Sequence, residues 1–126
     1  MHIQSNGNLL LLGSTKSSDY DLTSNAGKND AWVLQLDSNG LVLNSISYGG
    51  SEDEAFYDAH LLSNGGMLVS GYAESYDGDV QGWHSGQVNG NPETDAWIVE
   101  LNSSFIIQWQ KCLGGSGADQ LNDIEQ

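Results

Sequence analysis

Aspartates recur in closely spaced pairs at two places in this sequence. Asp19 and Asp21 form one pair, and Asp77 and Asp79 form the other, with a glycine between the last two. Alternating carboxylates on a glycine-containing loop can supply the oxygen ligands that calcium prefers, although an EF-hand loop would carry a further acid at its twelfth position. The pairs therefore predict calcium binding, and the alternative is that each aspartate caps the backbone of its own turn.

The second pair belongs to a loop that also carries an aromatic ring. Trp83 and His84 follow Gln81 in the part of this loop that has no counterpart in the first half of the chain. A loop tryptophan can stack on a sugar ring while neighbouring polar groups bind its hydroxyls. We therefore predict a glycan site whose residues are Asp77, Asp79, Gln81, Trp83 and His84. The alternatives are a tryptophan folded back over the sheet and a solvated histidine.

The familiar arrangements of catalytic residues are missing from the sequence. There is no Gly-x-Ser-x-Gly elbow and no zinc-type cluster of His and Cys, and the single cysteine, Cys112, is expected to be a half-buried structural thiol. Glycoside hydrolysis needs two acids, and the chain offers many, among them Asp53, Glu54, Asp119 and Glu125. Because acids are abundant, this signal is weak. We predict a protein that is not an enzyme, with a glycoside hydrolase or lyase as the alternative.

The charge balance excludes whole classes of partner. The 126 residues include 17 acids, 3 lysines and no arginine, for a net charge of −14. Such a chain is repelled by nucleic acid and by anionic membrane surfaces. Without arginine it also lacks the side chain that usually binds a carboxylate or phosphate through two hydrogen bonds. No apolar run is long enough to span a membrane, and the first residues do not resemble a signal peptide.

An internal repeat is the strongest pattern in the chain. Residues 30–37 recur as 95–102, and Gly49, Gly50 and Ser51 recur at the same spacing of 65 residues. Residues 5–13 recur as 63–71, at a spacing of 58. The loop before the second copy of the tryptophan strand is longer, which accounts for the difference. A fixed period with one variable loop indicates a repeat architecture.

Each period contains four segments that read as short strands. In the second repeat they are residues 53–62, 66–72, 95–102 and 105–113, separated by turns rich in Gly, Asn and Ser. Trp32 and Trp97 occupy the same strand position, so both are expected to pack in a core. Four short strands per repeat are typical of a β-propeller blade. We predict an all-β chain of two blades, with residues 1–50 in the first, 51–115 in the second and 116–126 as the first strand of a third. A β-sandwich of two four-stranded sheets is the alternative.

Several of these segments also resemble a known group of proteins. Residues 109–119, the turn at 64–66, the loop at 77–80 and the strand Asp95–Leu101 are similar to the propeller-like repeats of secreted Bacteroidetes surface proteins of the type 9 secretion kind. The resemblance covers almost the whole chain, and the shared motifs are structural. It implies an extracellular or cell-surface β-propeller without a known reaction.

Two blades cannot close a ring, and this predicts how the chain assembles. If one chain's last strand completes the first blade of the next, copies join head to tail and the rotation can close. We expect a homo-oligomer, preferably a trimer of six blades, and the alternative is a fragment of a longer array. The predicted function is a non-catalytic repeat module for ligand binding or scaffolding. Carbohydrate is the leading ligand, and a purely structural surface-protein repeat is the alternative.

Overall fold

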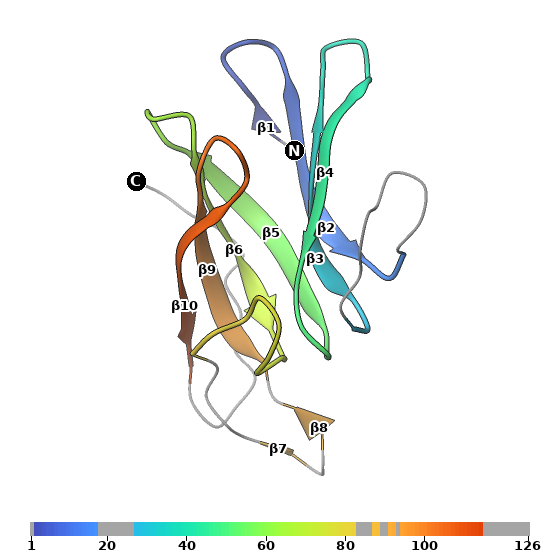
Figure 1. The fold of residues 1–126 in the computed structure, drawn as a ribbon, viewed down its shortest axis with the longest axis vertical. Coiled ribbons are helices and arrows are strands. Elements are labelled where there is room, and N and C mark those ends of the chain that lie inside the picture. Colours follow the sequence, from blue (N-terminus) through green and yellow to red (C-terminus); the bar gives the residue numbers. More distant parts are fainter. Residues whose placement is uncertain (1, 18–26, 83–86, 89–90, 93, 115–126) are drawn as a thin grey trace.

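The computed structural model describes residues 2–17, 27–82, 87–88, 91–92 and 94–114, and every regular element in them is a β-strand. The strands form two four-stranded antiparallel sheets and one small ribbon (Figure 1). The prediction of an all-β chain with two four-stranded sheets is thereby confirmed. No helix in the described part of the chain is long and apolar enough to cross a membrane.

The two sheets follow one another along the chain. The first has the order β1-β2-β3-β4 and consists of β1 (His2–Ile3), β2 (Leu9–Thr15), β3 (Asp30–Leu36) and β4 (Val42–Tyr48). The second has the order β10-β9-β6-β5 and consists of β5 (Glu54–Leu61), β6 (Met67–Ala73), β9 (Asp95–Leu101) and β10 (Ile107–Leu113). The ribbon pairs β7 (Gln87–Val88) with β8 (Asn91–Pro92), inside the longer loop before β9.

The short strand β1 completes the first sheet to four strands. It lies at the edge of the sheet, next to β2. His2 pairs with Leu10 in this ladder, and its Nε2 lies 2.9 Å from Oδ1 of Asp58 on β5. Strand β1 therefore contacts both sheets through His2.

The tight turns recur with the same hydrogen bonds in both repeats. Asn6 Oδ1 accepts the N–H two residues later at 3.0 Å, and Asn64 Oδ1 does the same at 2.9 Å. Asp37 Oδ1 accepts the N–H groups two and four residues later, and Asn102 Oδ1 repeats both bonds. Short Asx side chains cap turns in this way, so the same turn chemistry sets the register of both sheets.

One turn departs from the repeat. Gly40 has a φ of 87°, and its counterpart 65 residues later is Phe105, with a φ of 63°. A non-glycine residue in this left-handed region costs roughly 1–2 kcal/mol. The Phe105 side chain is buried, and its carbonyl accepts a 2.5 Å hydrogen bond from the Tyr48 hydroxyl on the other sheet. Packing and this bond between the sheets oppose the backbone strain.

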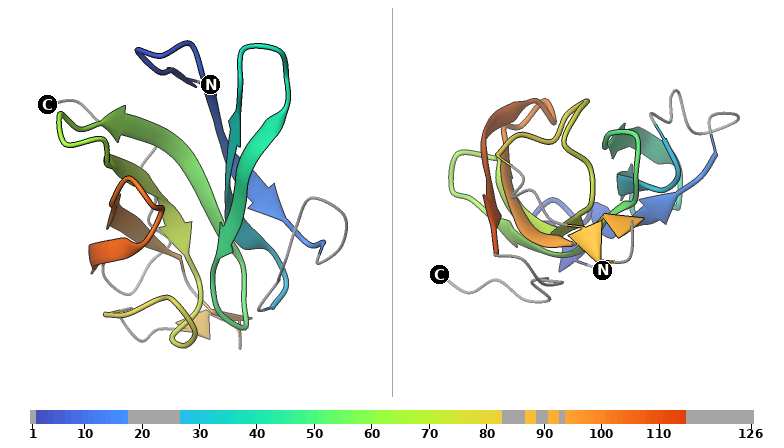
Figure 2. Two further views of the ribbon diagram at one scale, coloured as in Figure 1. Left: turned by 45° about the horizontal axis from the view of Figure 1, so that its top comes forward. Right: turned by 90° about the horizontal axis from the view of Figure 1, so that it is seen from below.

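The core lies between the two sheets, which stand side by side as separate twisted layers (Figure 2). β5 packs against β2 and β3, and the Phe56 and Trp97 rings stack with centroids 5.1 Å apart. Trp97 is 0% exposed, as predicted for a core tryptophan. Trp32 differs because it is only partly buried. Strand alternation places its side chain on the face of the first sheet that points away from the second.

Candidate functional site

The loop after β6, residues 74–82, contains three of the predicted ligand-binding residues. Asp77, Asp79 and Gln81 all lie within it. The loop is drawn in olive at the lower end of Figure 1. One side of it bonds to the segment that leaves β4, and the other side bonds to the edge strand β10. It therefore connects the two sheets and also borders the surface.

The two aspartates of this loop bind backbone of the segment that connects β4 to β5. Asp79 Oδ2 accepts the N–H of Gly49 at 3.0 Å, and the N–H of Asp79 donates to the Gly49 carbonyl at 2.9 Å. Asp77 Oδ1 accepts the N–H of Ser51 at 2.8 Å. Hydrogen bonds to a carboxylate are stronger than neutral ones. These side chains therefore hold the segment between the sheets, rather than capping their own turn.

Glu54 completes this contact from the start of β5. It is 0% exposed, and its carboxylate accepts the N–H of Gly50 and the N–H of Ser75, both at 2.9 Å. Burial raises the pKa of Glu54, and the hydrogen bonds from Ser75 and from the backbone oppose that rise. We name Glu54, Asp77 and Asp79 the carboxylate junction, because together they bind backbone on both sides of the sheet-to-sheet connection.

The junction is too tight for side chains at its glycines. A Cβ on Gly49 would lie 2.6 Å from Glu54 Oε2 and 2.7 Å from Asp30 Oδ1, and one on Gly78 would overlap the Gly49 carbonyl. Gly78 also has a φ of 64°, which side chains disfavour. Gly49 is thus required by the close approach of two carboxylates, and Gly78 by the close approach of backbone.

Gln110 fixes the other side of the loop. Its Oε1 accepts the N–H of Gln81 at 2.9 Å and Nε1 of Trp97 at 3.0 Å. Its Nε2 donates to the Asp79 carbonyl at 2.6 Å. An open groove of about 490 Å³ lies between the edge of the loop and the start of β10. It is lined by Gly78, Asp79, Gln81, Ile107, Gln108, Trp109 and Gln110. Amide and carboxylate groups therefore border an accessible groove, and Gln110 holds its two sides together.

Trp109 stands at the rim of this groove. It is 46% exposed, and its Nε1 donates to the carboxylate of Glu100 on the neighbouring strand. Trp109 and Gln110 are neighbours on β10, where they pair with Glu100 and Val99. The Trp109 and Gln110 side chains therefore lie on opposite faces of the second sheet. The indole is thus held in place and has an accessible surface.

The predicted sites have different outcomes. Asp77, Asp79 and Gln81 are close together, whereas Trp83 and His84 of the glycan site and Asp19 and Asp21 of the calcium site lie outside the described residues. Within the described ranges, no three His, Cys, Asp or Glu side chains are arranged to hold a metal ion. Each described aspartate of the proposed calcium site already accepts a backbone hydrogen bond. Calcium and glycan binding both stay predictions.

Two residues that hold the 74–82 loop in place are not among the predicted ligand-binding or metal residues. The sequence offers Glu54 only as one of many acids for hydrolysis, and Gln110 belongs to no predicted site. The repeat contained a usable signal for Glu54, because Asp119 stands 65 residues later and each acid follows a Gly-Gly pair. Gln110 had no such signal, because Ser45 replaces it in the first repeat.

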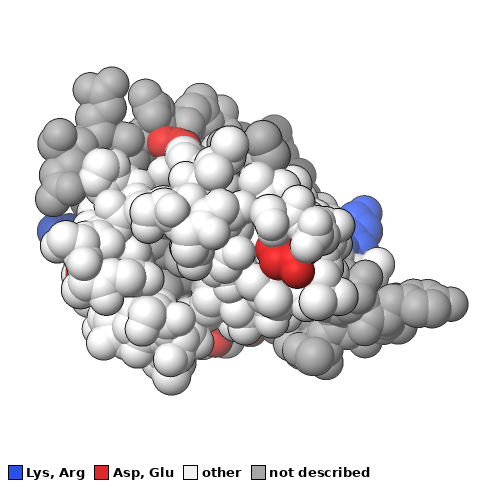
Figure 3. Space-filling view, turned by 90° about the horizontal axis from the view of Figure 1, so that it is seen from above, with Lys and Arg blue, Asp and Glu red and all other residues white. Residues whose placement is uncertain are grey.

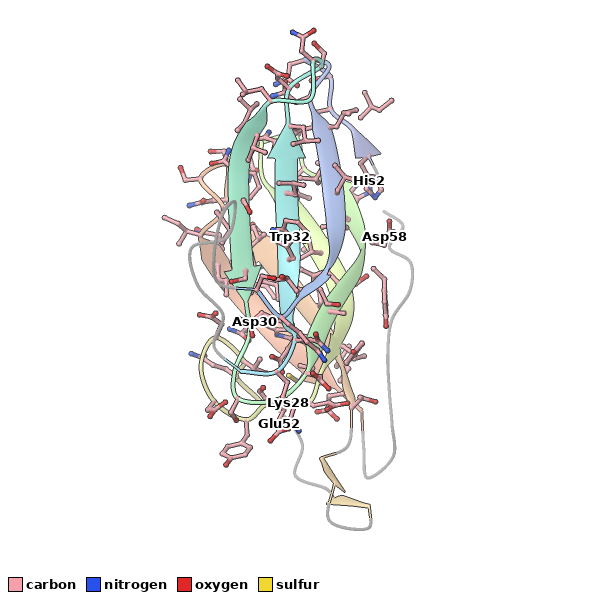
Figure 4. The ribbon with its side chains drawn as sticks, turned by 90° about the vertical axis from the view of Figure 1, so that its right-hand side faces the viewer. His2, Lys28, Asp30, Trp32, Glu52 and Asp58 are labelled. Atoms are coloured by element: carbon pink, nitrogen blue, oxygen red, sulfur yellow. The ribbon has the colours of Figure 1, made fainter. Side chains whose placement is uncertain are left out.

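The two ion contacts in the described part of the chain lie outside the carboxylate junction. The ion pair between Lys28 and Glu52 and the contact between His2 and Asp58 lie apart from one another (Figure 4). In the view from above, the charged side chains are scattered among uncharged ones (Figure 3). Cys112 is buried, and burial raises the pKa of its thiol to about 12. A thiol with such a pKa is a poor nucleophile at neutral pH.

No known family model matches the chain, and no curated protein is similar enough to count as a relative.

Proposed function

We propose that this chain is a non-catalytic β-propeller module, with each sheet as one blade, that binds neutral glycans at a cell surface. The groove beside the 74–82 loop carries the proposal, because its polar groups are accessible while its frame is fixed by Gln110. Sugar sites combine such polar groups with an aromatic surface, and Trp109 offers one at the rim. The cell-surface location is supported by the resemblance to secreted repeat proteins.

The arrangement of the acids supports a non-catalytic role. A glycosidase places two carboxyl groups on either side of an accessible bond. Glu54 is fully buried and accepts backbone hydrogen bonds, and its neighbour Asp53 accepts the N–H of Asn29 at 2.9 Å. Asp58 is bonded to His2. These acids are used for structure, so we propose that the module binds its ligand and leaves it unchanged.

A purely structural repeat is the second candidate, and the carboxylate junction favours it. Three acids bind the backbone that connects the two sheets. A protein whose only task is to build a rigid array would need this junction and would not need the groove. The two candidates therefore differ in what the groove does.

Binding to a panel of neutral oligosaccharides tests the proposal. Gln81→Ala and Trp109→Ala should each weaken the binding of the best hexasaccharide at least roughly tenfold in calorimetry, which corresponds to about 1.4 kcal/mol. Tyr76→Ala is the matched control, because Tyr76 is exposed on the same loop and does not line the groove. Absence of binding to every sugar would support the structural repeat, and release of new reducing ends would support the hydrolase.

A further inference from the structure

The two sheets are copies of one repeat, yet they meet through different faces. The first sheet contributes Leu10, Val33 and Tyr48, which share one side of its ladders and are buried. The second sheet contributes Val69 and Trp97, which are also buried. The counterparts of these last two in the first sheet are on its other side. The two sheets therefore contact each other through non-equivalent faces, which is a heterologous contact. The other face of the first sheet and the other face of the second sheet have no partner in the described part of the chain.

The unused face of the first sheet is apolar. We name it the open face, and its residues are Leu9, Leu11, Trp32, Leu34 and Leu36. Their counterparts in the second sheet, all exposed by 1% or less, are Met67, Val69, Trp97, Val99 and Leu101. The open-face residues are only partly buried. Figure 4 looks onto this face, with Trp32 near its middle. The same side chains are thus covered in one sheet and accessible in the other.

The unused face of the second sheet corresponds to the face that provides the cover. We name it the outer face, and its apolar residues are Leu68, Ala96, Ile98 and Leu113. Their counterparts in the existing contact, all buried, are Leu10, Ala31, Val33 and Tyr48. Leu113 is 39% exposed, and Leu68 and Ile98 are partly exposed. The outer face is therefore apolar at four positions that the existing contact uses, whereas Ser70 and Lys111 stand where the first sheet has Leu12 and Ile46.

We propose that a second copy of this chain places its outer face on the open face, in the geometry by which the two sheets already pack. A second copy is the partner because its outer face presents the counterparts of the side chains that cover the equivalent face within one chain. A heterologous contact has no twofold axis, so it continues from copy to copy until the rotation closes. We expect closure at three copies and six sheets.

Two further observations fit this docking. The Trp32 Nε1 already donates to Ser45 Oγ at 3.0 Å, just as Trp97 Nε1 donates to Gln110, so covering Trp32 leaves no unpaired donor. Asn44, the counterpart of Trp109, stays exposed beside the existing contact. The rim of the groove would therefore stay open in the assembly.

Light scattering on the full chain tests the proposal. The wild-type chain should move from monomer to trimer as its concentration rises, and added salt should favour the trimer because each copy carries −14 charges. Trp32→Glu and Ile98→Glu should each weaken association roughly a hundredfold, because an unpaired charge would be buried against an apolar face. Leu34→Glu repeats the test on the open face if Trp32→Glu fails to fold. Leu41→Glu, in an exposed turn, is the control and should still form trimers.

Mixing the variants provides the sharpest comparison. Trp32→Glu retains an intact outer face and Ile98→Glu an intact open face, so the folded pair should form a one-to-one complex that grows no further. A wild-type chain that stays monomeric at every concentration and salt, or a mixture that forms no complex, would overturn the proposal. The inference rests on the blade arrangement proposed above but not on glycan recognition, so failure in the sugar titration leaves the mass measurement unaffected.

Discussion

Removal of the Glu54 carboxylate should destabilise the whole chain. In Glu54→Ala, the buried N–H groups of Gly50 and Ser75 lose their acceptor. Each unsatisfied buried donor costs about 1–3 kcal/mol, so we expect a loss of about 4 kcal/mol. This is a large fraction of the roughly 5–15 kcal/mol that stabilises a typical domain. Since a domain of this size loses roughly 4 °C of Tm per kcal/mol, the Tm should fall by about 15 °C.

Thermal unfolding followed by circular dichroism measures this effect directly. Glu52→Ala is the matched control, because it removes an acid two residues away whose partner is the exposed Lys28. Because the Lys28 side chain is 59% exposed, solvent screens this ion pair, and the control should keep a Tm close to that of the wild type. If the two variants had the same Tm, the junction would not hold the sheets together and the reasoning would be refuted.

Three further predictions follow from the junction and from the core. Gly49→Ala should lower the free energy of unfolding in urea by about 1–3 kcal/mol because its Cβ would overlap two carboxylates. Gly13→Ala is the control and should cost much less, because a Cβ there meets no atom within 4 Å. Equal costs for the two variants would contradict this prediction. Burial raises the pKa of Glu54 in the folded chain above its ordinary value of 4.5. Between pH 4.5 and the folded-state pKa, the unfolded chain has lost this proton while the folded chain still holds it, so the free energy of unfolding falls as the pH rises. The stability of the wild type relative to Glu54→Gln should therefore decrease over this window, and an increase would show that the sign is wrong. The Cys112 thiol, with a pKa of about 12, should resist iodoacetamide at pH 8 in the folded chain and react once urea unfolds it, so rapid labelling of the folded chain would show that it is accessible.

The repeat made the strands predictable because turn chemistry and apolar runs are local. The Asn and Asp side chains that cap the hairpins bond only two to four residues ahead, so their spacing can be read directly from the sequence. The difference between Trp32 and Trp97 could not be predicted in this way. Both tryptophans lie in nearly identical strands, and only the placement of one sheet beside the other determines which ring is covered.

The acids of the loop show the same limit more clearly. Asp77 and Asp79 are spaced like metal ligands, but the groups they bind lie 26 and 30 residues earlier in the chain. A carboxylate that binds a distant backbone N–H has no signature in its own neighbourhood. The spacing of the aspartates therefore drew attention to the loop that connects the two sheets, but it did not predict which groups these aspartates bind.

The hydrogen bond between Tyr48 and the Phe105 carbonyl gives the two kinds of contact unequal strength. In the proposed contact between copies, Leu113 would stand in place of Tyr48 and Gly40 in place of Phe105, so the hydroxyl and the buried ring would both be absent. The contact within a chain would therefore be the stronger one. Such a chain folds before it associates, and its assemblies can exchange subunits while each subunit stays intact.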